Sequence, residues 1–194
     1  MAIERAVSEQ DLIDALAKSA ATLSDNRVRY AIIGGMATGF RSQPRFTKDV
    51  DILLQVPQIK LPLLLEDFAR RGFDVDQLDV IREWTQHHMA TISYHGIRVD
   101  LLKPVLPAYQ HILDRARAET WLDHPIRVAS AEGLILLKLL AFRTQDVLDI
   151  ENLVAASGKS LDLDWIRGEW QTIESLDDPR MKRLEELVAR RQAN

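Results

Sequence analysis

Residues 30–54 read "YAIIGGMATGFRSQPRFTKDVDILL", where a Gly-Gly pair ends one apolar run and two aspartates lie inside the next. Residues 28–33 are rich in β-branched and aromatic side chains, and they predict a strand that turns tightly at Gly34 and Gly35. Residues 48–56, "KDVDILLQV", predict a second strand. Residues 36–40, "MATGF", are expected to open a short helix between the two strands, so this stretch mixes strand and helix.

Three aspartates are candidates for a metal site. Asp49 and Asp51 project from the same face of their strand, because residues two apart in a strand point the same way. Asp100 lies in the hairpin that we predict for residues 89–102, "MATISYHGIRVDLL". Three neighbouring carboxylates repel one another unless protons or cations neutralise them, and Mg²⁺ prefers oxygen ligands. The sequence therefore predicts a divalent-metal site at these three residues.

The glycine pair predicts a phosphate site beside the metal. Gly34 and Gly35 allow close approach of the backbone to a phosphate, and free N–H groups at the start of a following helix favour anions. A Gly-Gly pair alone is usually only a turn, and an isolated Asp-x-Asp in a strand can be the polar face of an edge strand. The two together, between apolar flanks, favour a functional site.

The remaining elements divide the chain into a mixed half and a helical half. We predict a short edge strand in residues 124–130, "HPIRVAS", and only helical signals from Ser130 onward. The fold class is α/β (α+β), with a mixed β-sheet flanked by helices. Residues 1–129 are the predicted core with its N-terminal helix, and residues 130–194 are the predicted α-helical C-terminal subdomain. Helices are predicted from Ser8 onward and at residues 61–71, 107–119, 131–143, 146–156 and 179–192.

The composition limits the class of protein. The absence of cysteine excludes disulfides, Cys-ligated zinc and thiol catalysis, and it fits a reducing cytosol. The longest apolar run, "LILLKLLAF", is far shorter than the roughly 20 residues of a membrane span. We therefore expect a cytoplasmic protein without membrane contact. A net charge of -4 and a pI of 5.7 disfavour a surface that binds nucleic acid all over, although they permit a local basic patch.

The spacing Gly-Gly, thirteen residues, Asp-apolar-Asp, with a later strand aspartate, resembles the signature of the DNA polymerase β-like nucleotidyltransferase superfamily. Within that superfamily, "IIGGMATGFRSQPRFTKDVDILL" and "LLKLLAFRTQDVLDIENLV" are most similar to the AbiEii-type and related toxin-like bacterial nucleotidyltransferases. The similarity covers residues 28 to about 155.

The resemblance implies an enzyme that uses an NTP as substrate and Mg²⁺ (or Mn²⁺) as cofactor. Gly34 and Gly35 would hold the NTP phosphates, Asp49 and Asp51 would ligate the metal, and Asp100 would complete the metal site and help deprotonate an acceptor hydroxyl. The acceptor stays open between a tRNA or other RNA end, a protein and a small molecule. The likeness to toxin-like families also implies an antitoxin protein as a partner.

The resemblance also implies two candidate site residues in the predicted helices, Lys138 and Asp149. It implies that Lys138 contacts the triphosphate; the alternative is a lysine whose methylenes pack while its ammonium reaches solvent. Asp149 is a lower-ranked site candidate, because it and Asp146 favour a structural role, pairing with Arg143 or capping the second helix. Lys138 and Asp149 can meet only if the helix breaks near Thr144.

Arg41, Arg45 and Lys48 make the loop before the aspartates basic, which would attract a triphosphate or an RNA end; a solvated loop is the alternative. The predicted function is a Mg²⁺-dependent nucleotidyltransferase that transfers NMP from an NTP to an acceptor hydroxyl, with a role in a toxin–antitoxin pair. The alternative is a non-catalytic nucleotide- or partner-binding module of such a pair. A zinc or Ser-His hydrolase lacks any supporting spacing.

Overall fold

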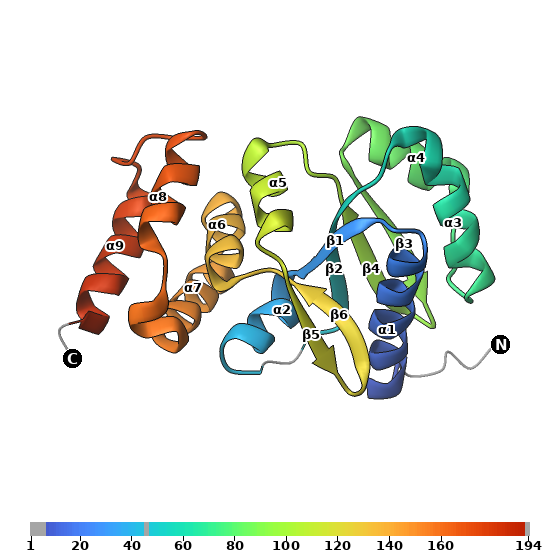
Figure 1. Cartoon of the computed structure of the whole chain (residues 1–194), viewed down its shortest axis with the longest axis horizontal. Coiled ribbons are helices and arrows are strands. Elements are labelled where there is room, and N and C mark those ends of the chain that lie inside the picture. The colour runs from blue at the N-terminus through green and yellow to red at the C-terminus, as the bar shows by residue number, and fades with distance from the viewer. Residues whose placement is uncertain (1–6, 45–46, 193–194) are drawn as a thin grey trace.

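The computed structural model describes residues 7–44 and 47–192. Within these ranges the chain forms a six-stranded sheet, nine α-helices and two short 3-10 helices (Figure 1). In chain order the elements are α1 (Glu9–Asp25), β1 (Arg29–Ile33), α2 (Gly34–Arg41), β2 (Asp49–Gln55), η1 (Gln58–Lys60), α3 (Leu61–Arg70), α4 (Gln77–Gln86), β3 (Met89–Tyr94), β4 (Ile97–Leu102), α5 (Pro107–Asp114), β5 (Arg117–Trp121), β6 (His124–Val128), α6 (Ala131–Ala141), α7 (Thr144–Ser157), η2 (Gly158–Ser160), α8 (Leu163–Gln171) and α9 (Pro179–Gln192).

The sheet is mixed, as the sequence predicts. Its strand order is β3-β4-β2-β1-β6-β5. The sequential pairs β1/β2, β3/β4 and β5/β6 are antiparallel, whereas β2/β4 and β1/β6 are parallel. The central strand β2 therefore lies between β1 and β4, and this position brings the end of β1 and the middle of β4 beside its first residues.

The N-terminal elements follow from local signals. Ser8 caps α1 through a capping box with Asp11, as expected from a serine followed three residues later by an acidic side chain. The turn at His95 and Gly96 joins β3 to β4, and both residues have positive φ, which suits a tight hairpin turn. The helix that follows β1 begins at Gly34 itself, so no loop separates strand from helix.

Two predicted elements are wrong in part: one helix ends early, and one strand is not at the sheet edge. The helix predicted for residues 107–119 ends at Asp114, and residues 117–121 form the strand β5. Side chains of β5 are exposed or only half-buried, so the sequence of this segment shows no clear alternation of apolar and polar residues. The segment is a strand because it pairs with β6. The strand in residues 124–130 is consequently not at the edge, because β6 lies between β1 and β5.

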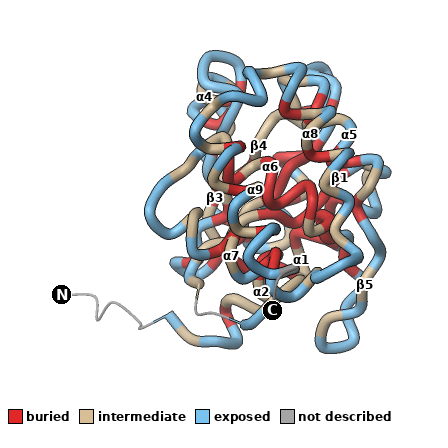
Figure 2. Tube along the Cα trace, turned by 90° about the vertical axis from the view of Figure 1, so that its left-hand side faces the viewer, coloured by how far each residue is buried: buried red, intermediate tan, exposed pale blue. Residues whose placement is uncertain are grey.

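Residues beyond Ser130 that the structure describes form helices without a strand, on the left of Figure 1. Helix α6 is apolar nearly all round, and its buried leucines and isoleucine join the same hydrophobic cluster as the sheet. Figure 2 shows the buried parts of the trace gathered in the centre of the molecule, with α6 among them. No helix of the described chain has both the length and the apolar character needed to cross a membrane.

Candidate active site

Three carboxylates lie on one face of two neighbouring parallel strands. Asp49 and Asp51 are the first and third residues of β2, and the residue between them, Val50, is fully buried on the other face. In the register of β2 with β4, Asp51 lies opposite Asp100 and Asp49 lies opposite Arg98. Side chains at partner positions of adjacent strands point the same way. The structure thus brings together the three aspartates singled out in the sequence.

Two neighbours hold the Asp100 carboxylate. The hydroxyl of Thr91, on β3, donates a hydrogen bond of 2.7 Å to Oδ1, and Arg98 Nε donates to the same oxygen at 2.8 Å. Arg98 lies two residues earlier on the same strand, and its contact with Asp100 raises the pKa of the guanidinium. The Arg98 side chain is about half exposed (54%), whereas the Asp100 side chain is only 14% exposed.

Among the three carboxylates, Asp51 is the one whose ionised form is clearly destabilised by its surroundings. Its pKa is raised from 3.8 to about 6, first by burial and then by the negative charges of Asp100 and Asp49. Lys138 and Arg98 lower the pKa of Asp51 in part. A cation bound beside Asp51 would relieve this repulsion, because a nearby positive charge stabilises the ionised carboxyl.

The donor set fits a divalent cation in its chemistry. Carboxylate oxygens are the ligands that Mg²⁺ prefers, and the raised pKa of Asp51 marks the place where positive charge is lacking. As the side chains stand, however, no group of three or more His, Cys, Asp or Glu within residues 7–44 and 47–192 is arranged to hold a metal ion. The metal roles of Asp49, Asp51 and Asp100 therefore remain predictions.

Gly34 fits the carboxylate cluster so closely that no side chain can replace its hydrogen. Its φ is +66°, in the left-handed region that favours glycine. A Cβ atom built on Gly34 would lie 1.9 Å from Asp51 Oδ2, which is a severe overlap. This contact arises because Ile33, the residue before Gly34, pairs with Asp51 across β1 and β2. The glycine is thus required by the aspartate as well as by the turn.

The start of α2 adds donors to the same place. Helix α2 begins at Gly34, and its N-cap residue, Ile33, has no side chain that could accept a hydrogen bond from the first N–H groups. Such uncapped N–H groups attract anions. The carboxylates and these donors lie side by side, since Gly34 contacts Asp51. Binding of phosphates by Gly34 and Gly35 remains a prediction that this placement supports.

Lys138 is buried and paired, so the alternative of a lysine reaching solvent is wrong. Its side chain is 7% exposed, and Nζ lies 2.5 Å from Asp149 Oδ2 and 3.6 Å from Asp146 Oδ1. The contact is made because the helix breaks at Phe142, which has left-handed backbone angles, and α7 then packs back against α6. The condition stated for Lys138 and Asp149, a break near Thr144, is met.

Asp146 has the structural role that the sequence favoured for it. Its carboxylate accepts a hydrogen bond of 3.0 Å from the backbone N–H of Arg143, the N-cap residue of α7, and so caps the start of that helix. Asp149 is completely buried and also accepts a hydrogen bond of 3.3 Å from Gln145. Contact between Lys138 and a triphosphate remains a prediction.

Among the basic residues before β2, Arg41 is held by partners of its own. Arg41 is the last residue of α2; it donates 2.9 Å to the carbonyl of Ala129 and pairs with Glu119 at 2.6 Å. Arg41 therefore ties α2 to β5 and β6. Arg45 lies outside the described residues. Lys48 is exposed and directly precedes Asp49, so it remains a candidate for triphosphate contact.

Sequence reasoning missed Thr91 and Arg98, although the sequence holds the signal for both. A hairpin centred on His95 and Gly96 pairs Tyr94 with Ile97, and counting outward from that pair places Thr91 opposite Asp100. Arg98 shares a face with Asp100, because the two residues are two apart on one strand.

Comparison with known proteins gives a family and a fold. The family model described as "Nucleotidyl transferase of unknown function (DUF2204)" matches residues 12–186. Among curated proteins, none matches the chain. The family supports the resemblance to nucleotidyltransferases in general, and it does not single out the AbiEii-type subgroup.

Solved structures with 12–18% sequence identity share the fold. An antigenic nucleotidyltransferase-like protein from Paracoccidioides brasiliensis has 18% identity and a TM-score of 0.54, over 95% of this chain and 88% of that one. JHP933 from Helicobacter pylori has 14% identity and a TM-score of 0.51, over 97% and 93%. The antibiotic-resistance factor ANT(2'')-Ia has 12% identity and a TM-score of 0.50, over 96% and 94%.

Proposed function

The chain belongs to the family of nucleotidyl transferases of unknown function (DUF2204), and from this premise we propose that it transfers a nucleoside monophosphate from an NTP to an acceptor hydroxyl. In this reaction the acceptor oxygen forms a bond to the α-phosphorus, the bond from that phosphorus to the bridging oxygen breaks, and pyrophosphate leaves. Phosphoryl transfer of this kind depends mainly on positioning and charge neutralisation.

One observation carries the proposal: Asp51 and Asp100 lie opposite each other on parallel strands, with Asp49 on the same face and the Gly34 backbone against Asp51. In this proposal Asp49 and Asp51 hold Mg²⁺ (or Mn²⁺), which when bound supplies positive charge to the phosphates. Asp100 receives the proton of the acceptor hydroxyl. Gly34 and Gly35 present backbone N–H groups to the phosphates at the start of α2.

Two cations of the chain act on these carboxylates. Arg98 neutralises Asp100 in the absence of other cations, and it must release Asp100 for that carboxylate to accept a proton. Lys138 sits between the aspartates of α7 and the strand cluster, and its charge lowers the pKa of Asp51. In this proposal Lys138 also contacts the triphosphate, and its hydrogen bond of 2.5 Å to Asp149 holds the ammonium in place.

A transfer assay tests the proposal. The protein is incubated with each α-³²P-labelled NTP, Mg²⁺ and, in separate reactions, total RNA, total protein and small hydroxyl compounds such as aminoglycosides. We expect label to pass to one acceptor class, with loss of roughly 100-fold or more in rate for Asp49→Asn. Asp177→Asn, at a side chain 90% exposed beside α9, is the matched control and should transfer at the wild-type rate.

The same assay separates the alternative. If the labelled NTP binds but stays intact and no acceptor becomes labelled, the proposal of a transferase is wrong. That result would favour a non-catalytic nucleotide-binding module. The toxin-like resemblance makes an antitoxin protein the partner to add in that case. Transfer that persists in Asp49→Asn would reject the site proposed here.

A further inference from the structure

The outer edge of β3 already forms one isolated backbone bridge, to a residue outside the sheet. β3 ends the sheet on one side, and its inner edge pairs with β4. On the outer edge the chain's own Asp74 forms an isolated bridge to Ser93. In this bridge the Asp74 N–H donates to the Ser93 carbonyl at 2.8 Å, and the Ser93 N–H donates to the Asp74 carbonyl at 3.2 Å. The edge is therefore available for strand pairing, and the chain uses it at one position.

Two further positions of this edge point outward. Backbone N–H and C=O groups alternate in direction along a strand, so Thr91 and Met89 share the outward direction of Ser93. The hydrogen bond at His88 agrees with this alternation. Its carbonyl accepts a hydrogen bond of 2.8 Å from the N–H of Lys103, just after β4, and therefore points inward, away from the outer edge. No strand of the described chain lies beyond β3. Met89 and Thr91 thus offer backbone groups to a further strand.

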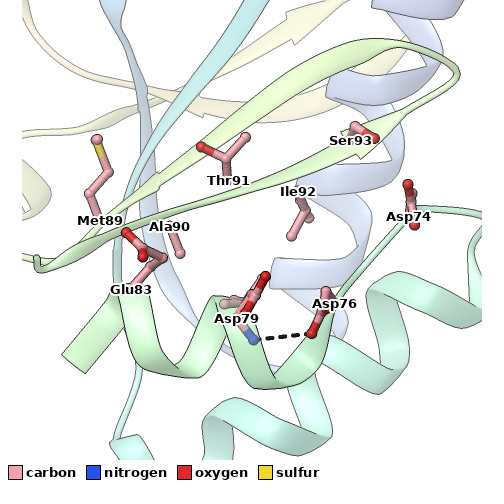
Figure 3. Close-up of a pocket in the computed structure, with 10 residues that line it drawn as sticks. Asp74, Asp76, Asp79, Glu83, Met89, Ala90, Thr91, Ile92 and Ser93 are labelled. Atoms are coloured by element: carbon pink, nitrogen blue, oxygen red, sulfur yellow. Dashed lines mark hydrogen bonds between the residues drawn. The ribbon is translucent and has the colours of Figure 1, made fainter. Parts of the chain in front are cut away.

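An acidic groove runs along this edge. A cavity of about 460 Å³ lies between β3 and α4, and its lining holds no lysine or arginine (Figure 3). Ala90 and Ile92 point toward α4, whereas Thr91 points to the opposite side. Asp79 also pairs with Arg82, but both side chains are more than half exposed, so that pair is weak. The acidic members of the lining are Asp74, Asp76, Asp79 and Glu83.

We propose that this groove docks an extended segment of a partner protein that contains lysine or arginine, and that the segment adds to β3 as a further strand. Outward backbone groups at Met89 and Thr91 would bind its main chain, and the four carboxylates would bind its cationic side chains. The phosphates of an RNA would be repelled by the same carboxylates. The open backbone positions favour a peptide over a small cation, which would leave them unused.

The groove adjoins the candidate active site through one side chain. Thr91 lies on the docking edge, and its hydroxyl donates a hydrogen bond of 2.7 Å to Asp100. A docked segment that carries a serine, threonine or tyrosine would bring a hydroxyl close to the proposed proton acceptor. We therefore favour a protein as the acceptor; this step rests on the proposed function, whereas the docking itself does not.

A model peptide tests the docking without any transfer reaction. The probe is a fluorescein-labelled peptide of about nine residues that alternates lysine with valine, which favours an extended strand. Binding is measured by fluorescence anisotropy against the full chain. Two matched peptides serve as comparisons: one with glutamate in place of lysine, and one N-methylated at alternate residues, which removes the donors along one edge. We expect both to bind roughly tenfold or more weakly.

Variants of the chain locate the site. Asp79→Asn combined with Glu83→Gln should weaken binding of the lysine peptide roughly tenfold, whereas Asp177→Asn combined with Glu186→Gln changes the net charge equally and should leave binding unchanged. Thr91→Pro and Thr91→Val both lose the hydroxyl, but only the proline loses the outward N–H. The proline variant should therefore bind several-fold more weakly than the valine variant.

Three results would overturn the docking. One is that the lysine peptide does not bind the wild-type chain. Another is that the N-methylated peptide binds as tightly as the lysine peptide, since the site would then bind cationic side chains without hydrogen bonds to the peptide backbone. The third is that both double variants, the one in the groove and the control, lose the same amount of affinity for the lysine peptide, which would show non-specific electrostatic attraction. None of these bears on the transfer assay, so the docking can fail while NMP transfer stands; transfer to RNA alone would remove the protein acceptor.

Discussion

At the scale of single residues, ionisation of Asp51 lowers the stability of the folded protein. Its pKa is raised from 3.8 to about 6 by burial and by Asp100 and Asp49. The folded protein therefore binds this proton more tightly than the unfolded chain does. Stability is greatest below pH 3.8 as far as Asp51 is concerned, and its contribution is lost as the pH rises to about 6. At neutral pH the ionised carboxylate costs on the order of 3 kcal/mol.

Replacing Asp51 by asparagine should therefore stabilise the protein. The free energy of unfolding of Asp51→Asn at pH 7 is expected to exceed that of the wild type by roughly 1–2 kcal/mol, and the difference should vanish near pH 4. Urea unfolding between pH 4 and 8 measures it. Added Mg²⁺ should raise the stability of the wild type more than that of the variant, because only the wild type keeps the charged ligand.

Asp164→Asn is the control, since that side chain is 93% exposed and should show no gain at any pH. A loss of stability in Asp51→Asn at pH 7 would mean that the carboxylate is satisfied by its surroundings. The repulsion argued for the cluster would then be wrong.

At the scale of elements, the junction of α6 and α7 matters most. Phe142 adopts left-handed backbone angles and ends α6, so α7 turns back along it. This brings the Asp149 carboxylate, which is completely buried, to 2.5 Å from the Lys138 ammonium. A buried ion pair contributes little net stability, but removing one partner leaves a poorly compensated charge.

A double-mutant cycle tests this pair. Lys138→Met alone and Asp149→Leu alone should each lower the free energy of unfolding by roughly 3–5 kcal/mol, and the double variant should lose much less than the sum. The exposed pair of Arg167 and Glu185 is the comparison; there Arg167→Met should cost less than about 1 kcal/mol. Additive losses at Lys138 and Asp149 would show that the two side chains are stabilised separately.

Elements with a strong local signal could be predicted, and those held by pairing could not. The capping box at Ser8, the Gly-Gly turn and the hairpin at residues 89–102 are all visible in the sequence. The first three residues of β5 lie inside the helix predicted for residues 107–119, because the side chains of β5 are largely exposed and only its pairing with β6 makes it a strand. Helix α4 escaped notice because it buries only Val80 and Trp84.

The candidate site could be predicted in its residue types and only partly in its arrangement. Asp49 and Asp51 share a face by strand geometry alone. The position of Asp100 beside Asp51 depends on the parallel pairing of β2 with β4, which no local pattern encodes. The contact between Gly34 and Asp51 likewise depends on how β1 and β2 are aligned.

At the scale of the whole molecule, one hydrophobic cluster joins both halves of the chain. It extends from Ala15 in α1 to Val188 in α9 and includes the sheet. Helix α2 packs on β1 and β2 and also contacts α6 and α7, so the predicted boundary at residue 129 crosses a packed interface. Four residues of α6, Leu134, Ile135, Leu136 and Leu139, are at most 1% exposed within this cluster.

This continuity predicts that the chain unfolds as one unit. Heating should give a single calorimetric transition that coincides with the loss of near- and far-ultraviolet circular dichroism, and the calorimetric and van't Hoff enthalpies should agree. A fragment ending at residue 129 should not fold alone, because losing the four buried α6 side chains would forgo about 1.5–3 kcal/mol for each. The total approaches the whole stability of a typical domain. Two separate transitions, or a fragment with cooperative unfolding of its own, would instead establish residues 1–129 and 130–194 as independent domains.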